Sequence, residues 1–260
     1  MTLESLRYDG APQRRTQIMA ALRRSGFLSV TDLADQLGVS PMTVRRDLRR
    51  LAERGEAVLV HGGVSLPPGG AVGSSYLHRA QVNPEAKLVV GRAAAALVAP
   101  GDTIGVDSGT TAAAVAHCLP DDFDGCLITH SVPVLAQMLN RPRVRVIGLG
   151  GEVLHENQAM VGFAALDLLQ RMRVRMLFLG ASAVDARGVY VRSEVELTAK
   201  HAVMEIADEV VLVVDGSKFD ASAPVRVCAF DRIDTLVTDV DLPPAVADAA
   251  RRAGTRLVRA

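Results

Sequence analysis

The 260-residue chain contains no tryptophan, and aromatic residues make up only 3% of it. Hydrophobic residues nevertheless account for 49% of the sequence. A core of normal size must therefore be built mostly from aliphatic side chains, and this composition excludes a chain that stays disordered. The length allows either one large domain or two smaller ones.

Cysteine is equally scarce. Cys118, Cys126 and Cys228 form an odd set with no C-x-x-C spacing, which argues against a disulfide framework and a zinc site and fits unpaired thiols in a reducing compartment. The six histidines show no H-x-x-x-H spacing, so we predict no metal site. No apolar run reaches the length of about 18 residues that crosses a membrane, and the N-terminus lacks an apolar signal segment. We expect a cytoplasmic protein that binds no membrane.

Charge is balanced over the whole chain but not along it. The formal net charge is zero, whereas residues 1–63 contain 10 arginines against 7 acidic residues. Lysine is rare, with only Lys87, Lys200 and Lys218. A lysine can be retained at a position that needs a compact ammonium group, which arginine does not provide. Chance explains any single lysine equally well. The basic excess near the N-terminus points to a nucleic-acid-binding module there.

Residues 40–51 predict an amphipathic helix whose exposed side is basic. Ser40 can cap the N-terminus, and Pro41 suits the first turn. Apolar residues at i, i+4 and i+7 form one stripe, which consists of Val44, Leu48 and Leu51. Four arginines fall on other faces, namely Arg45, Arg46, Arg49 and Arg50. Arginine neutralises phosphates and binds guanine edges, so the helix suits DNA, although an ordinary solvated helix shows the same pattern.

The segments around this helix favour DNA binding. Two short helices, the first over residues 12–24, precede it, and Gly38 marks the turn that leads into it. Residues 57–64 predict a hairpin, or wing. Helix, turn, basic helix and wing in this order predict a winged helix-turn-helix domain. Residues 1–11 show no periodicity, so we expect a loose tail there.

Specific motifs strengthen this prediction. They include Gly38-Val39-Ser40, Thr43-Val44-Arg45-Arg46-Asp47-Leu48 and His61-Gly62-Gly63. With these motifs, residues 14–64 resemble the winged helix-turn-helix of the DeoR family of bacterial transcription regulators, which implies a double-stranded DNA operator as partner. The side chains expected at the DNA are Ser40, Met42, Thr43, Arg45, Arg46, Arg49, Arg50 and His61. Val60 departs from the family pattern, which often has arginine just before His-Gly-Gly.

The composition changes after the wing. Proline, glycine and serine cluster without periodicity over residues 67–83, which predicts a linker between a DNA-binding domain over 12–66 and a second domain over 84–260. In the second domain, short apolar runs alternate with helical patterns, among them helices over 85–98 and 161–169. This alternation predicts βαβ units and a mostly parallel sheet covered on both faces, in a Rossmann-like α/β fold.

A polar motif follows the first predicted strand of the second domain. Asp107-Ser108-Gly109-Thr110-Thr111 ends the strand and opens a helix. A helix N-terminus beyond a strand end offers free N–H groups and a partial positive charge, which suit a phosphate. The alternative is an ordinary strand-to-helix turn with threonine caps.

Other charged residues follow neighbouring strands. Asp215-Gly216-Ser217-Lys218 comes after one apolar strand, and Asp185 comes shortly after another. Lys200 is expected on a helix with Glu196 one turn earlier, so a surface ion pair is the alternative to a ligand contact there. For Lys218 the alternative is a solvated loop. Strand ends meet at one edge of a parallel sheet, so together these residues predict a pocket for an anionic, hydroxyl-rich ligand.

Further motifs match the same family, including Gly150-Gly151 and Gly180-Ala181-Ser182. Residues 84–240 resemble the C-terminal sensor domain of the DeoR family, which is similar in fold to ribose-5-phosphate isomerases. The resemblance implies a phosphorylated sugar effector, with its phosphate at the Gly109 loop and its sugar facing Asp185, Lys200 and Lys218. The expected effector contacts are Asp107, Ser108, Gly109, Thr110, Thr111, His130, Gly150, Gly151, Asp185, Lys200, Asp215 and Lys218. His130 stands where the family often has asparagine.

No cofactor is predicted. Gly148-Leu149-Gly150-Gly151 lacks the third glycine of a dinucleotide fingerprint and does not clearly precede a helix.

Three functions fit these patterns. The first is a regulator that represses genes of sugar or carbohydrate metabolism as a homo-oligomer, a dimer or tetramer, since two heads are needed on a palindromic or repeated operator. The second is a sugar-phosphate isomerase-like enzyme fused to a DNA-binding domain. Residues 186–193 lack the glycine-rich run that carries the isomerase base, which leaves only Glu194 or Glu196 for that role. The third is an architectural DNA-binding protein. We adopt the first and expect no enzyme activity.

Overall fold

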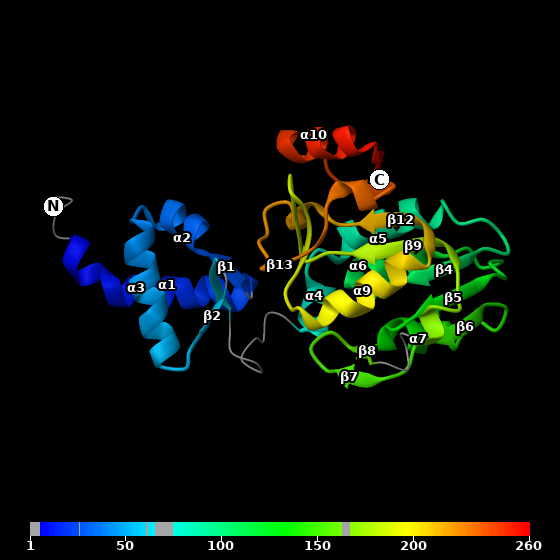
Figure 1. The fold of residues 1–260 in the computed structure, drawn as a ribbon, viewed down its shortest axis with the longest axis horizontal. Coiled ribbons are helices and arrows are strands. Elements are labelled where there is room, and N and C mark those ends of the chain that lie inside the picture. Colours follow the sequence, from blue (N-terminus) through cyan, green and yellow to red (C-terminus); the bar gives the residue numbers. More distant parts are fainter. Residues whose placement is uncertain (1–5, 26, 61, 66–74, 163–166) are drawn as a thin grey trace.

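The computed structural model describes residues 6–25, 27–60, 62–65, 75–162 and 167–260. It shows a smaller N-terminal lobe and a larger C-terminal lobe (Figure 1). Each lobe has its own hydrophobic core, built mainly from aliphatic side chains as the composition predicts.

The smaller lobe is a winged helix-turn-helix, as predicted. It comprises α1 (Leu6–Ser25), β1 (Phe27–Ser29), α2 (Val30–Leu37), α3 (Pro41–Glu53), β2 (Val58–Val60) and β3 (Gly63–Ser65). The three strands form an antiparallel sheet in the order β1-β3-β2, with β2 and β3 as the wing. The apolar stripe of α3 packs into the core of this lobe, which leaves the opposite face of the helix in solvent.

Short polar residues set the helix boundaries of this lobe. The Ser29 hydroxyl accepts a hydrogen bond from the Asp32 N–H at 3.0 Å and starts α2. Gly38 ends α2 with a φ of 63°, a conformation that favours glycine. Ser40 starts α3, because its hydroxyl accepts from the Thr43 N–H at 3.2 Å. Local sequence therefore fixes the turn that orients α3.

One local prediction for this lobe was wrong, and one strand was not predicted. The tail expected over residues 1–11 is helical from Leu6 onward, and residues 1–5 lie outside the described part. Gly10 and Pro12 lower helix propensity, but neither stops the helix here. The strand after α1 was not predicted from the sequence, because Phe27–Ser29 pairs with the distant Gly63–Ser65.

The larger lobe is built on a seven-stranded, fully parallel sheet, which confirms the predicted α/β fold. The strand order is β15-β14-β12-β9-β4-β5-β6. The strands are β4 (Thr103–Val106), β5 (Cys126–Thr129), β6 (Arg145–Gly148), β9 (Val174–Gly180), β12 (Ala207–Val213), β14 (Thr235–Thr238) and β15 (Arg256–Arg259).

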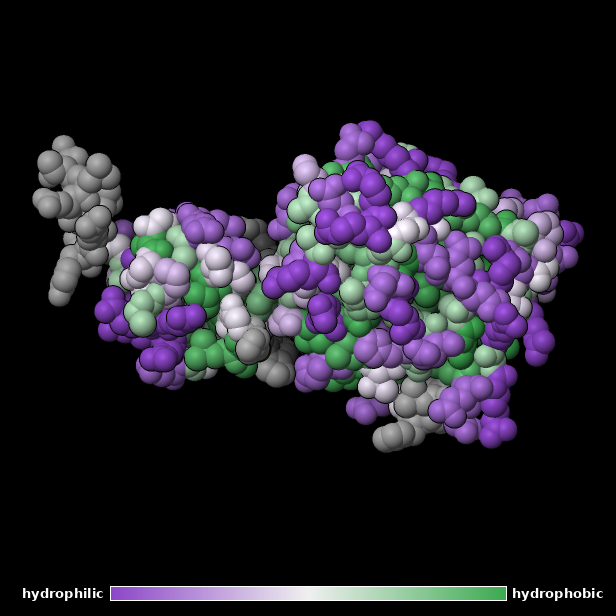
Figure 2. Space-filling view, turned by 45° about the horizontal axis from the view of Figure 1, so that its top comes forward, coloured by the Kyte–Doolittle hydropathy of each residue, from purple (hydrophilic) through white to green (hydrophobic). Residues whose placement is uncertain are grey.

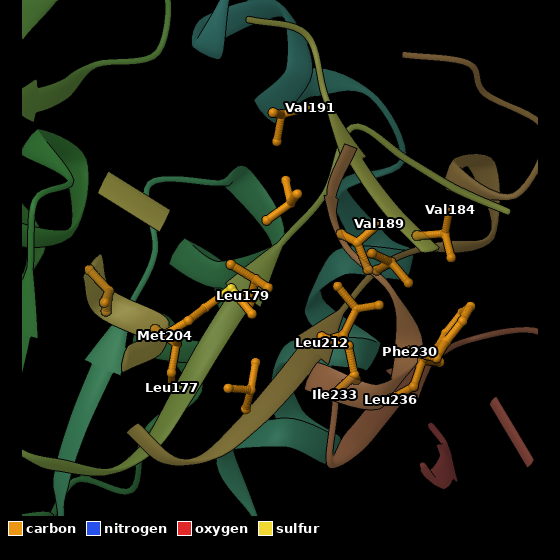
Figure 3. Packing of buried hydrophobic residues seen from close by; sticks show 14 of the residues in the cluster. Leu177, Leu179, Val184, Val189, Val191, Met204, Leu212, Phe230, Ile233 and Leu236 are labelled. Carbon is orange, nitrogen blue, oxygen red and sulfur yellow. The ribbon is translucent and has the colours of Figure 1, made fainter. Parts of the chain in front are cut away.

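Both faces of this sheet are covered. Side chains of β9 alternate between the two cores, with Met176 and Phe178 on one side and Leu177 and Leu179 on the other. The first side packs against α5 (Pro84–Ala95), α6 (Thr110–Cys118) and α7 (Val132–Met138). The second side packs against α9 (Val195–Glu205), α10 (Pro244–Ala253) and a small sheet (Figure 3).

Several elements of this lobe were not predicted. The small antiparallel sheet consists of β10 (Ala183–Asp185), β11 (Gly188–Val191) and β13 (Val225–Cys228). A two-stranded ribbon consists of β7 (Glu152–Leu154) and β8 (Ala159–Val161). The helix expected over 161–169 was wrong at its start, because Val161 belongs to β8; residues 163–166 lie outside the described part, and 167–169 are helical. Within the expected linker, Tyr76–Gln81 forms a short helix, α4.

The surface of the larger lobe is largely hydrophilic, since most apolar side chains lie in the cores. Hydrophilic side chains cover most of the face of the larger lobe seen in Figure 2, and hydrophobic ones appear in scattered patches. No helix in the described part of the chain has the length and apolar character of a membrane span. Cys118, Cys126 and Cys228 are all unpaired.

The wing generates a first prediction. A Cβ at Gly63 would lie 2.2 Å from the Leu28 carbonyl oxygen and 2.7 Å from the Phe27 ring, both in the adjacent strand. We expect Gly63→Ala to destabilise the smaller lobe by about 1–3 kcal/mol, the usual cost of overpacking. This loss of stability should appear as faster hydrogen exchange of the α3 amides.

The control is Gly10→Ala, whose added Cβ would meet only an Arg14 nitrogen at 3.9 Å. Because alanine favours a helix over glycine by about 1 kcal/mol, this change should leave exchange unchanged or slow it. Equal exchange in Gly63→Ala and the wild type would contradict the wing packing.

Candidate functional site

The exposed face of α3 carries the predicted DNA contacts. Val44, Leu48 and Leu51 are at most 1% exposed, so the opposite face of α3 must lie in solvent. That face presents Met42, Arg45, Arg46, Arg49 and Arg50, all of them exposed. Ser40 and Thr43 lie at the N-terminal end, where their hydroxyls are 3.0 Å apart. His61 lies outside the described residues.

A buried carboxylate that the sequence reasoning missed positions this helix. Asp47 is 2% exposed and accepts from Arg14 Nε at 2.6 Å and Arg15 Nη1 at 3.4 Å. These contacts join α3 to α1, so the arginines of α3 point outward from a fixed helix. The signal was available, because Asp47 lies next to Leu48 on the side of the apolar stripe.

The wing differs from the family pattern as the sequence indicated. Val58 and Leu59 of β2 are exposed, with Leu59 at 47%, and Val60 is half-buried. No cation stands at these three positions. A contact of β2 with DNA would therefore be apolar or made by its backbone.

A pocket lies in the larger lobe, where the carboxyl ends of β4 and β9 meet the N-terminus of α6. Of the predicted effector contacts, it contains Ser108, Gly109, Thr110, Thr111, Lys200 and Lys218. Gly109 begins α6 without a side-chain cap, so first-turn N–H groups of the helix remain for a ligand. The chain also passes closely here, because a Cβ on Gly109 would lie 3.4 Å from Gly180 Cα.

A buried ion pair forms the floor of this region. Asp107 and Lys200 are 2% and 4% exposed and form a salt bridge. Asp107 Oδ2 also accepts from the Gly180 N–H at 3.0 Å, and Lys200 Nζ donates to the Gly180 carbonyl at 3.1 Å. Burial acts to raise the pKa of Asp107, but Lys200, His130 and the Gly180 N–H together outweigh it, so the pKa is lowered. The alternative that Lys200 forms a surface ion pair with Glu196 is therefore wrong.

His130 lies beside this ion pair. Its Nε2 is 3.6 Å from Asp107 Oδ1, a buried oxygen with no hydrogen-bond partner in the described structure. Burial lowers the pKa of His130, and the nearby Lys200 lowers it further, against the opposing effect of Asp107. The ring therefore favours the neutral state and faces an apolar cavity lined by Leu149 and other side chains.

A second buried carboxylate holds the Lys218 loop. Asp215 is 1% exposed, and its Oδ1 accepts from the Ser217 N–H at 3.1 Å. Lys218 Nζ lies 3.7 Å from Asp215 Oδ2, and its side chain is only 16% exposed. A solvated loop lysine is therefore wrong for Lys218. Burial lowers the pKa of Lys218, although Asp215 opposes this.

The pocket also contains residues that were not predicted as contacts, namely Arg79, Asn157, Ser182, Arg192 and Glu196. Burial and the nearby charge of Arg79 lower the pKa of Arg192 to about 10. Arg192 Nη1 is buried with no hydrogen-bond partner in the described structure. Arg192 and Arg79 were missed because Arg192 directly follows β11 and Arg79 lies on α4. The sequence did not reveal either of these two elements.

Three predicted contacts lie elsewhere. Asp185 is on β10, where its side chain pairs with Arg187 at 2.9 Å and lines a groove between the lobes instead of the pocket. Gly150 and Gly151 do not line the pocket either. Gly151 adopts a φ of 149° next to the Val161 carbonyl, so it serves the β7–β8 ribbon.

The burial of His130 predicts a pH effect on stability. The unfolded chain takes up this proton as the pH falls through about 6.5, while the folded protein resists it. Stability should therefore fall from pH 7 to pH 5, by at most about 1.4 kcal/mol per pH unit for one proton. In His130→Asn the fall should be shallower, because asparagine does not titrate.

Urea unfolding across this range measures the effect. His117→Asn, at an exposed position, is the matched control and should keep the wild-type profile. Parallel profiles of His130→Asn and the wild type would show that His130 does not titrate differently on folding.

Comparisons with known proteins agree with these two sites. A DeoR-like helix-turn-helix domain matches residues 14–68, and a DeoR C-terminal sensor domain matches residues 82–240. The chain is 32% identical over 235 residues to the glycerol-3-phosphate regulon repressor of Escherichia coli K12, covering 90% of this chain and 93% of the relative. It is 33% identical over 249 residues to the HTH-type transcriptional regulator GlpR of Haloferax volcanii, covering 95% and 96%.

Other similarities are weaker. The L-fucose operon activator of Haemophilus influenzae is 28% identical over 227 residues, covering 87% of this chain and 91% of the relative. Ribose 5-phosphate isomerase A of Methanocaldococcus jannaschii aligns with a TM-score of 0.40 and 22% identity, covering 53% of this chain and 55% of the other. A likeness at that score carries no inference about activity.

The three relatives found by sequence similarity are transcriptional regulators, so the isomerase hypothesis is set aside. Both domain matches occur in the expected order, and the relatives align over nearly their whole length. The chain belongs to the DeoR family of DNA-binding transcriptional regulators.

Proposed function

We propose that the exposed face of α3 binds operator DNA and that a phosphorylated sugar in the larger lobe's pocket controls this binding. One observation carries the proposal. The uncapped N-terminus of α6 and four cationic side chains line one pocket, namely Arg79, Arg192, Lys200 and Lys218. Free N–H groups, a helix dipole and several cations together favour a phosphate dianion.

Some of these residues contact the effector, and others hold the contacting residues in place. The N–H groups and hydroxyls at the start of α6 bind the phosphate, as does Lys218. Asp107 acts through Lys200, and Asp215 acts through Lys218, because each carboxylate is already engaged by its lysine. Asp185 does not line this pocket, so we leave it out of the proposed contacts.

The regulator acts as a homo-oligomer and represses genes of carbohydrate metabolism. Two DNA-binding heads are needed to read a palindromic or repeated operator, and one chain supplies a single head. The E. coli relative is a repressor of the glycerol-3-phosphate regulon, which supports repression, whereas the H. influenzae relative is an activator. Binding of effector must favour one DNA-binding state over the other for control to occur.

Arg46 tests the DNA-binding face. We expect Arg46→Ala to weaken binding to operator DNA by about 1–3 kcal/mol, because a base-edge or phosphate contact is lost. Fluorescence anisotropy on DNA from the upstream region of its own gene measures the change. Arg252→Ala, at an exposed position of α10, is the control and should bind as the wild type. Unchanged affinity in a folded Arg46→Ala protein would remove this side chain from the interface.

Gly109 tests the phosphate loop. In Gly109→Asp the new carboxylate would accept the α6 N–H groups and repel phosphate, so effector binding should weaken roughly tenfold or more. DNA binding without effector should stay intact, since α3 lies in the other lobe.

Gly109→Asn is the matched control, because it has the same size without the charge. It should impair the effector response less than Gly109→Asp. A wild-type response of Gly109→Asp to phosphorylated sugars would place the phosphate elsewhere.

A further inference from the structure

The short helix α4 joins the two functional regions along the chain. It spans Tyr76–Gln81 and is the last described element between the wing and α5, the first helix packed on the sensor sheet. Ser75 caps it by accepting from the His78 N–H at 3.3 Å. A structural change that is transmitted along the backbone from the sensor sheet to the DNA-binding lobe must therefore pass through this helix.

Both ends of α4 are attached to the larger lobe. At its start, the Tyr76 N–H donates to the Glu156 carbonyl at 2.7 Å. At its end, the buried ammonium of Lys87 donates to the carbonyls of Arg79 and Val82. Since Lys87 is 4% exposed, these bonds have little competition from water. The helix is therefore fixed to the larger lobe at both of its ends.

The Arg79 side chain extends from α4 into the pocket. Its Nη2 donates to Asn157 Oδ1 at 3.1 Å, and Asn157 also lines the pocket. The guanidinium thus lies beside the uncapped start of α6 and near Arg192 and Lys218. A planar guanidinium can bind two phosphate oxygens at once, which suits it to this position.

The charges that line the pocket do not balance. Four cations line the pocket, and Glu196 is the one acidic residue among the described lining residues. Lys200 is paired with Asp107, and Lys218 lies near Asp215. Arg79 and Arg192 repel each other, an effect that Glu196 and Glu156 offset in part at both arginines. A dianion between these two arginines would attract both of them and so hold α4 more firmly to the pocket.

We propose that Arg79 is an effector-binding residue and that, through it, α4 is the element that transmits occupancy of the pocket towards the DNA-binding lobe. The proposal rests on the phosphate site described above. In an empty pocket α4 is held by its backbone contacts and by the hydrogen bond from Arg79 to Asn157, and a bound phosphate adds a charge-assisted contact to the Arg79 side chain. The coupling free energy is the change in operator affinity that follows from this added contact at α4.

Hydrogen exchange of the full chain with inorganic phosphate as the probe tests this, with chloride at matched ionic strength as reference. Phosphate should slow exchange at the start of α6 and also over residues 76–82. In Arg79→Gln the protection of α4 should disappear, and phosphate affinity should fall roughly ten- to a hundredfold, as for a charged hydrogen bond. Arg79→Lys should recover part of both effects, because it keeps the charge.

Arg92→Gln is the matched control, since Arg92 is an exposed arginine of α5 outside the pocket, and it should behave as the wild type. Protection at α6 with unchanged exchange in α4 and unaltered phosphate affinity of Arg79→Gln would overturn this proposal alone. Absence of protection at α6 would instead overturn the phosphate site on which it rests. Wild-type exchange of the β4 and β9 amides without phosphate shows that the larger lobe of each variant is folded.

Discussion

The buried ion pair between Asp107 and Lys200 is the contact on which the effector pocket depends. It joins the end of β4, the end of β9 at Gly180 and the middle of α9 in a water-poor environment. Breaking such a pair costs about 3–5 kcal/mol, because one charge is then left buried without compensation. The pair therefore fixes the Gly109 loop before any ligand arrives, and the start of α6 stays open for an anion.

A similar device organises the DNA-binding lobe. Asp47, on the buried side of α3, engages Arg14 and Arg15 and so fixes the helix whose exposed arginines we propose to bind DNA. Each lobe thus has a buried carboxylate that is paired with a basic side chain and fixes the element carrying the proposed contacts. Control requires that the two lobes influence each other, and α4 is the described element that contacts the pocket and leads towards the smaller lobe.

Much of this could be predicted from the sequence, for physical reasons. The i, i+4, i+7 spacing of Val44, Leu48 and Leu51 determines which face of α3 is exposed. Parallel strands end at one edge, so residues that follow β4 and β12 were expected to meet, as Gly109 and Lys218 do. The small sheet and α4 are too short for periodicity and depend on contacts distant in sequence, so Arg79 and Arg192 were missed with them. Asp185 was expected at the strand ends but lies on β10, which pairs with β11 in a separate antiparallel sheet, and it lines another groove.

The most direct test is fluorescence anisotropy of the protein on DNA from upstream of its own gene, with a salt titration followed by a panel of phosphorylated sugars and their unphosphorylated counterparts. We expect tight, salt-dependent binding that changes only with a phosphorylated sugar. Tight binding that no phosphorylated sugar alters, or that unphosphorylated sugars alter equally, would contradict a phosphate-sensing regulator.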